Sequence, residues 1–150
     1  EITMPTVYLA GHVHNAWRYE PTEILRFSGY TVVCPHDEVD RLGGLPANCY
    51  MVRDLLAIRQ ADIVLAVFDR GKPYKYVGTA AECGLAKGLG KILLVAFEGE
   101  TPDMQEYPGH GSYDFPAGLA DVVYSSMAGA LDALRAAVHP NSWDVFRKTT

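Results

Sequence analysis

The sequence predicts an α/β fold: a flavodoxin-like five-stranded parallel sheet in the order 2-1-3-4-5, with helices on both faces. Short apolar runs alternate along the chain with segments of helical period, and each run is almost continuously hydrophobic. Parallel strands need a crossover segment between them, and strands covered on both faces have continuous rather than alternating apolar residues. The length of 150 residues suits one compact core. We therefore expect a single domain over residues 1–150.

Five short runs rich in Val, Ile, Leu and Tyr are the expected strands. In chain order they are Thr6–Ala10, Tyr30–Cys34, Asp62–Phe68, Lys91–Phe97 and Asp121–Tyr124. In a sheet of this kind, ligands bind beyond the carboxyl ends of the strands, where the strand order reverses. The loops Gly11–Arg18 and Asp69–Val77, with the start of the third helix, are therefore expected to surround one pocket.

Four segments between or after the strands have the period and the end signals of helices. They are Pro21–Phe27, a helix from the N-cap Asn48 to about Gln60, Gly78–Leu89 before Gly90, and a helix from the N-cap Ser126 to about Val138. The stretch Thr101–Pro116 is the least regular part of the chain. We expect it to form a surface excursion that covers the pocket or meets a second subunit.

Composition limits the classes of partner. The formal net charge is −5, which disfavours capture of a nucleic-acid polymer through its phosphates and favours a small ligand. No apolar stretch approaches the roughly 18–20 residues of a membrane helix. Three cysteines without CxxC spacing argue against a disulfide framework and for a reducing compartment. We expect a cytoplasmic protein that does not interact with membranes.

Two short clusters contain side chains that bind metals elsewhere. They are His12 with His14, and Cys34 with His36 and Asp37. Neither completes a set of three or four ligands at a spacing typical of a metal site. We therefore expect neither a catalytic metal nor another cofactor.

Glu82 is the sharpest candidate for chemistry. It is the only acid between Gly78 and Lys91, its neighbours are small, and the segment opens a helix directly after a strand and a loop. Small neighbours leave a carboxylate open to close approach by a substrate, and an early helical position favours its ionised form. The alternative is an ordinary acid that stabilises the start of a helix.

Three groups of residues have an order and spacing that resemble the nucleoside 2-deoxyribosyltransferase family, across about residues 6–97. The groups are Thr6–Gly11, then Arg53-Asp54 with Ile58 and Ala61–Ala66, then Gly78-Thr79 with Glu82-Cys83-Gly84 and Gly90-Lys91. The resemblance implies cleavage of the N-glycosidic bond of a nucleoside or nucleotide through a covalent glycosyl-glutamate. By position it makes Glu82 the nucleophile, Asp54 the acid that meets the base, and Tyr8 the residue that orients Glu82.

The residue types suit this chemistry on their own terms. Cleavage of a C1′–N bond builds positive charge on the sugar and negative charge on the departing base. A carboxylate beneath C1′ answers the first demand, and an acid beside the base answers the second. Asp54 also has the simpler interpretation of a surface pair with Arg53, and Tyr8 that of a core tyrosine.

The chain departs from the resembled pattern in two places. The transferases place a sugar-binding aspartate where this chain has Tyr76. Asp69, at the end of the third strand, is the candidate to take its place. The asparagine that transferases lend from a neighbouring subunit has no clear counterpart here, with Asp114 or Ser112 as the candidates. The first departure favours nucleotide N-hydrolases of the same superfamily, which also lack that aspartate.

The remaining substrate-binding candidates are Gly11, His12 and Arg18 after the first strand, and Gly78 and Thr79 at the start of the third helix. Arg18 is suited to a 5′-phosphate through charge-assisted hydrogen bonds. It is equally consistent with a solvated loop residue.

We therefore expect an enzyme that transfers a 2-deoxyribosyl group between purine or pyrimidine bases, and that forms a homo-oligomer based on dimers, as the resemblance implies. Two alternatives are a nucleoside 5′-monophosphate N-glycoside hydrolase and a non-catalytic nucleotide-binding module on the same scaffold.

Overall fold

The computed structural model describes residues 4–12, 15–33, 47–71, 76–99 and 116–147. Several expectations lie outside these residues: those on His14, on Cys34, His36 and Asp37, and on residues 101–115. The side chain of Cys49 is likewise not described.

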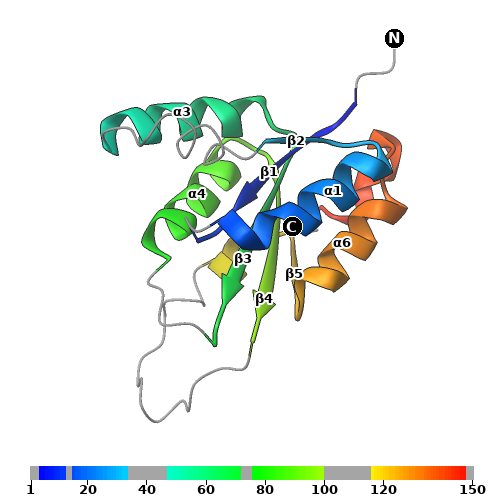
Figure 1. Cartoon of the computed structure of the whole chain (residues 1–150). Helices are drawn as coiled ribbons and strands as arrows, with labels where there is room; N and C mark the ends of the chain where they lie inside the picture. Colours follow the sequence, from blue (N-terminus) through cyan, green and yellow to red (C-terminus); the bar gives the residue numbers. More distant parts are fainter. Residues whose placement is uncertain (1–3, 13–14, 34–46, 72–75, 100–115, 148–150) are drawn as a thin grey trace.

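Five parallel strands form one sheet in the order β2-β1-β3-β4-β5, which confirms the predicted fold class (Figure 1). The strands are β1 (Thr6–Ala10), β2 (Thr31–Val33), β3 (Ile63–Asp69), β4 (Ile92–Glu98) and β5 (Val122–Tyr124). In the register of the central strands, Tyr8 of β1 pairs with Val64 of β3, which pairs with Leu93 of β4. The strand order reverses beside β1, because β2 lies on one side of it and β3 on the other.

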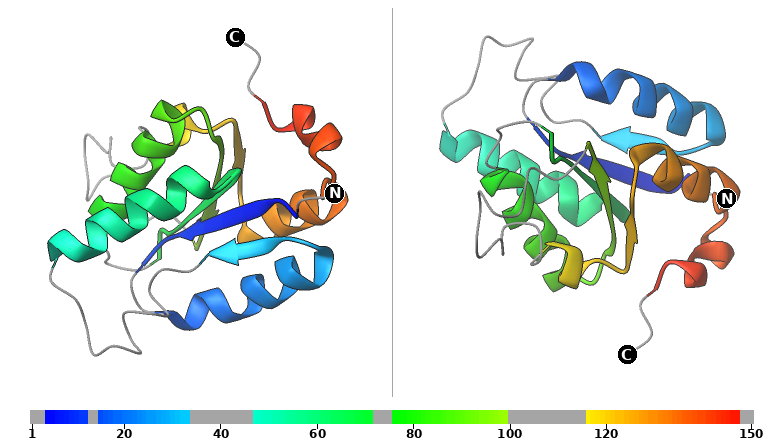
Figure 2. Two further views of the ribbon diagram at one scale, coloured as in Figure 1. Left: turned by 90° about the horizontal axis from the view of Figure 1, so that it is seen from above. Right: turned by 90° about the horizontal axis from the view of Figure 1, so that it is seen from below.

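Helices cover both faces of the sheet (Figure 2). The elements are the 3-10 helix η1 (Asn15–Arg18), α1 (Tyr19–Ser28), α3 (Ala47–Gln60), α4 (Val77–Gly88), α6 (Met127–Ala136) and the 3-10 helix η2 (Pro140–Val145). The pair α1 and α6 packs on one face, and the pair α3 and α4 packs on the other. Each described helix is too short or too polar to cross a membrane.

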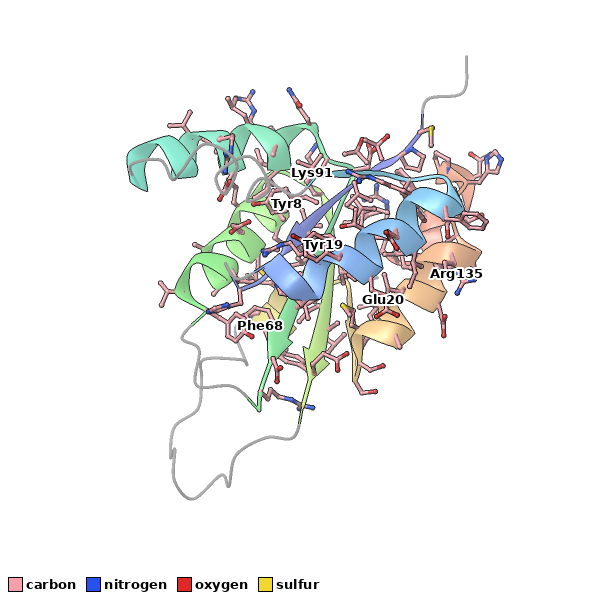
Figure 3. The ribbon with its side chains drawn as sticks, in the orientation of Figure 1. Tyr8, Tyr19, Glu20, Phe68, Lys91 and Arg135 are labelled. Carbon is pink, nitrogen blue, oxygen red and sulfur yellow. The ribbon has the colours of Figure 1, made fainter. Side chains whose placement is uncertain are left out.

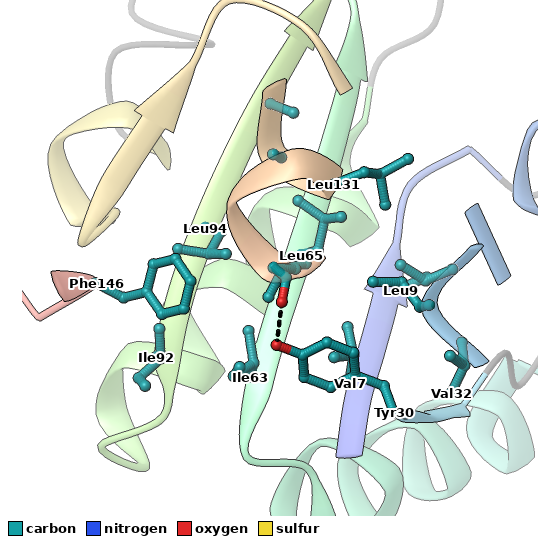
Figure 4. Close-up of a cluster of buried hydrophobic side chains, with 14 of the residues drawn as sticks. Val7, Leu9, Tyr30, Val32, Ile63, Leu65, Ile92, Leu94, Leu131 and Phe146 are labelled. Atoms are coloured by element: carbon teal, nitrogen blue, oxygen red, sulfur yellow. Dashed lines mark hydrogen bonds between the residues drawn. The ribbon is translucent and has the colours of Figure 1, made fainter. Parts of the chain in front are cut away.

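Alternation along β1 distributes its side chains between two cores. Val7 and Leu9 point into the core under α1 and α6 (Figure 4), while Tyr8 and Ala10 point into the core under α3 and α4. Successive strand residues face opposite sides of a sheet, so the period of two places Tyr8 on the face of α3 and α4. Tyr8 has no exposed surface.

The ends of several elements differ from the prediction. Tyr30 precedes β2, because its backbone N–H donates to the carbonyl of Leu25 and ends α1 beyond Gly29, whose φ is 110°. The Tyr30 hydroxyl donates across the core toward the carbonyl of Leu134 at 2.6 Å (Figure 4). Asn48 is not an N-cap, since α3 begins one residue earlier at Ala47.

The predicted cap of α6 is confirmed. The Ser126 hydroxyl accepts the N–H of Gly129 at 3.1 Å, which satisfies a donor that the first helical turn leaves without an intrahelical partner. The helix ends at Ala136, two residues before the predicted Val138.

Candidate active site

The central candidates come from four elements and influence one another electrostatically. Tyr8 comes from β1, Asp54 from α3, Glu82 from α4, and Arg18 from η1 shortly after β1. Figure 3 shows Tyr8 on the side of the sheet where α3 and α4 lie. The charges of Glu82, Asp54 and Arg18 each shift the pKa of Tyr8.

Glu82 lies at the centre of this group. The Tyr8 hydroxyl donates a hydrogen bond to its carboxylate, while the oxygen Oε2 is buried and has no hydrogen-bond partner among the described residues. Burial raises the pKa of Glu82 to about 7; the bond from Tyr8 and the charge of Arg18 oppose this rise, and Asp54 adds to it. The site therefore holds a carboxylate that interacts with Tyr8 and whose buried oxygen Oε2 has no described hydrogen-bond partner.

The sequence predicted that an early helical position would favour ionisation of Glu82, and this expectation is wrong. Glu82 is the sixth residue of α4, whose first turn contains no acid. The dipole effect fades within the first turn, whereas burial acts wherever the carboxylate is removed from water. Burial consequently sets the direction of the pKa.

Asp54 is a second, partly buried acid. Its side chain is 15% exposed and forms an ion pair with Arg53 at 3.8 Å. Burial raises the pKa of Asp54, while Arg53 and Arg18 lower it. The pair with Arg53 is therefore present, although it is partly buried and not at the surface. Asp54 also raises the pKa of Glu82, and its role toward a base stays a prediction.

Arg18 is not a solvated loop residue. It is 2% exposed, and its guanidinium donates to the carbonyls of Gly11 at 3.1 Å and His12 at 2.5 Å. It also lies 4.4 Å from the centre of the Trp17 ring, whose Nε1 donates to the same His12 carbonyl at 3.1 Å. A Cβ on Gly11 would lie 2.3 Å from the Trp17 ring, so this packing requires glycine.

The other predicted binding residues lie around the start of α4. Gly78 is exposed, and Thr79 is 4% exposed. Tyr76 precedes α4 with a left-handed φ of 49°, and its ring packs against Phe68 at 5.2 Å and is edge-on to His12 at 6.2 Å.

Asp69 is held in a turn at the end of β3. Its carboxylate accepts the N–H of Gly71 at 2.9 Å, and its own N–H donates to the Tyr76 hydroxyl at 2.9 Å. The charged groups that shift the pKa of Glu82 are Asp54 and Arg18. The described contacts of Asp69 are with Gly71 and Tyr76.

Sequence reasoning missed the ring of Trp17 and the conformation of Tyr76. A tryptophan beside an arginine gives no specific signal, and a tyrosine at positive φ is contrary to the usual preference. No group of three or more metal-binding side chains occurs within the described residues.

Comparisons with known proteins agree with this architecture. The chain is 32% identical over 109 residues to the uncharacterized protein YtoQ of Bacillus subtilis, which covers 59% of this chain and 72% of that protein. A 2-deoxyribosyltransferase structure from Leishmania mexicana has a TM-score of 0.67 at 22% identity, and covers 88% of this chain and 97% of that one. The CMP N-glycosidase BcmB of Clostridium botulinum has a TM-score of 0.57 at 18% identity, over 87% and 98% of the two chains.

At these identities, the two solved structures show a shared fold. The family model described as nucleoside 2-deoxyribosyltransferase matches residues 7–118, which include Tyr8, Arg18, Asp54 and Glu82. The chain therefore belongs to the nucleoside 2-deoxyribosyltransferase family.

Proposed function

We propose that the chain cleaves the N-glycosidic bond of a deoxynucleoside and transfers the 2-deoxyribosyl group to another base, with Glu82 as nucleophile. One observation carries the proposal: the Glu82 carboxylate interacts with the Tyr8 hydroxyl, and its buried oxygen Oε2 has no described hydrogen-bond partner. Family membership supports the class of reaction. An orienting bond on one oxygen leaves the other to attack a carbon atom.

In the first step, the ionised Glu82 carboxylate forms a bond to C1′ as the C1′–N bond breaks. The bonding pair leaves with the base, and Asp54 supplies the proton that neutralises it. In the second step, an acceptor base attacks C1′, the ester bond to Glu82 breaks, and Asp54 takes the acceptor's proton. Two displacements at one carbon retain the configuration.

The two acids have to be in opposite protonation states at the start. The proposed reactive form has the proton on Asp54 and the charge on Glu82. Burial raises the pKa of Asp54, which favours its protonated form. The bond from Tyr8 and the charge of Arg18 favour the ionised form of Glu82.

Hydrolysis of a nucleoside 5′-monophosphate is the second candidate, and the geometry at Tyr76 favours it. Tyr76 stands directly before α4, and the first turn of that helix contains no acid. The Asp69 carboxylate, its proposed substitute, is occupied in the turn with Gly71. Without an acid at the position of Tyr76, the site lacks a group that would hold the sugar hydroxyls while one base leaves and another takes its place. This lack disfavours transfer relative to hydrolysis.

The test is to incubate the protein with deoxynucleosides and, separately, with deoxynucleoside monophosphates, each with and without a free acceptor base. A new nucleoside that forms only with the acceptor supports transfer, and release of sugar without any acceptor supports hydrolysis. Intact-mass analysis after rapid acid quench should show a glycosyl adduct, localised by peptide mapping to Glu82.

Glu82→Gln should abolish turnover and the adduct, while Glu20→Gln is a matched control. Glu20 is an exposed acid on α1 (Figure 3), on the opposite face of the sheet from α3 and α4. Full activity in Glu82→Gln would refute the mechanism. Tight nucleotide binding without turnover across a panel of bases would select a non-catalytic module.

A homo-oligomer is part of the proposal and follows from the family resemblance. Size-exclusion chromatography with light scattering measures it directly. A monomer that retains full turnover would refute the idea that a neighbouring subunit completes the site.

A further inference from the structure

Arg18 already has several contacts within the protein, to two backbone carbonyls and to an aromatic ring. Its guanidinium donates to two successive backbone carbonyls, those of Gly11 and His12, and stacks near the Trp17 ring. The His12 carbonyl accepts from Arg18 and from Trp17 together. With 2% of its surface exposed, the side chain is built into the protein before any substrate arrives.

We propose that Arg18 is a positioning residue: it fixes the end of β1 and supplies the buried positive charge that lets Glu82 act as a carboxylate. In this role it is not a ligand for a substrate phosphate. Its catalytic consequence rests on the function proposed above. Its electrostatic role can be measured without turnover.

Arg18 holds the chain at the end of the strand that carries Tyr8. Tyr8 lies in β1, and the two carbonyls that Arg18 holds belong to the residues that directly follow this strand. Fixing these carbonyls fixes the course of the chain as it leaves β1. With 2% of its surface exposed, Arg18 offers almost no accessible surface to a phosphate that arrives from solvent.

Arg18 also contributes charge to the site. Among the described residues, the titratable and charged groups that act on Glu82 are Tyr8 from β1, Asp54 from α3 and Arg18 from η1, and Cys83 lies beside Glu82 on α4. Arg18 lowers the pKa of Tyr8, Asp54 and Glu82. Among the described cations, Arg18 is the one that lowers the pKa of Glu82, so loss of its charge removes a contribution that opposes the effect of burial on the Glu82 carboxylate.

The experiment uses two substitutions that separate charge from hydrogen bonding. Arg18→Gln keeps a donor for the carbonyls and removes the charge, whereas Arg18→Lys keeps the charge on a side chain of different shape. Arg26→Gln is the matched control, because Arg26 is an exposed arginine on α1 that also donates to a carbonyl, that of Val32 at 3.4 Å. Carbon-13 NMR of side-chain carboxyls follows the Glu82 titration, assigned with Glu82→Gln.

We expect the Glu82 midpoint to rise by about half a pH unit or more in Arg18→Gln, since an opposing charge is removed. It should stay at the wild-type value in Arg18→Lys and in Arg26→Gln. The pH profile of kcat/KM should move with the NMR midpoint. If Arg18→Gln does not fold, Arg18→Lys tests the charge role instead. A Glu82 titration midpoint in Arg18→Lys that differs from the wild type by about half a pH unit would refute that role.

Two other results would overturn the proposal. One is an unchanged midpoint in a folded Arg18→Gln protein. The other is a KM that rises at least tenfold for the deoxynucleoside monophosphate and not for the deoxynucleoside, which is the signature of a phosphate ligand. If the wild-type protein shows no turnover with any substrate, the proposed function fails, and the NMR midpoints still judge Arg18.

Discussion

Replacing Glu82 by Gln should make the protein more stable at neutral and alkaline pH while it removes activity. Gln has almost the shape of protonated Glu and can still accept the hydrogen bond from Tyr8. Burial raises the pKa of Glu82 from 4.5 to about 7, so the folded state binds this proton more tightly than the unfolded chain. The substitution removes the cost of placing a negative charge in the site.

The sign and the size follow from this difference in pKa. Between pH 4.5 and about 7 the folded form holds more protons at Glu82 than the unfolded form, so wild-type stability falls as pH rises and levels off above pH 7. At about 1.4 kcal/mol per pH unit the full effect is roughly 3 kcal/mol. Because Glu82 is only partly buried, we expect about 1–3 kcal/mol, or a rise in Tm of roughly 3–8 °C.

The assay is thermal and urea unfolding of the wild type, Glu82→Gln and the control Glu20→Gln at pH 5, 6, 7 and 8. Glu82→Gln should match the wild type at pH 5 and exceed it increasingly toward pH 8. Glu20 is exposed, so its variant should follow the wild type throughout. A stability difference between Glu82→Gln and wild type that does not change with pH would refute the buried-charge argument.

Four further outcomes follow from the same site. Activity should rise with pH through about 7 as Glu82 ionises, and a profile flat from pH 5.5 to 8.5 would contradict this. Tyr8→Phe should move the midpoint of the pH–activity profile upward and lower kcat/KM about 10–100-fold at pH 7, since a hydrogen bond to a charged group is lost. Its control is Tyr30→Phe, which alters a buried tyrosine outside the site and should lower stability without moving that midpoint. Asp54→Asn should lower kcat by about 10²–10⁴ and move the midpoint of the pH–activity profile downward, because Asp54 raises the pKa of Glu82. Asp132 is exposed, so Asp132→Asn is the control in the same measurements. Gly11→Ala should cost about 1–3 kcal/mol in urea unfolding because its Cβ would strike Trp17, while Gly88→Ala, where a Cβ meets open space, should cost nothing.

The strand order and the two helical layers were predictable because they follow from hydrophobic runs and crossover lengths. The placement of Tyr8 was also within reach, since alternation along β1 decides which face it joins. The ends of elements were less predictable where side chains or distant segments compete for the backbone. Tyr30 looks like a strand residue, yet its N–H is used by the end of α1.

The electrostatics of the site were not predictable from neighbours in the sequence. The pKa of Glu82 depends on groups from β1, η1 and α3, which are far from it along the chain. Arg18 looked like a solvated loop residue or a phosphate ligand, because a pattern of residues does not show which backbone carbonyls a guanidinium will meet. Arg18 is covered by the Trp17 ring, and that ring fits only because residue 11 is glycine.

The same burial that raises the pKa of Glu82 also explains why a carboxylate there would form an ester with a sugar. An ionised Glu82 lacks the hydration that would stabilise it, and Tyr8 satisfies only one of its oxygens. In the proposed mechanism, bond formation to C1′ removes the negative charge from the more deeply buried carboxylate of Glu82 and passes it to Asp54, which has given its proton to the base. The charge of Arg18 opposes the rise in the pKa of Glu82 and so favours the ionised form that the attack requires. A site with Glu82 fully exposed would ionise more readily, but hydration would then compete with attack on the sugar.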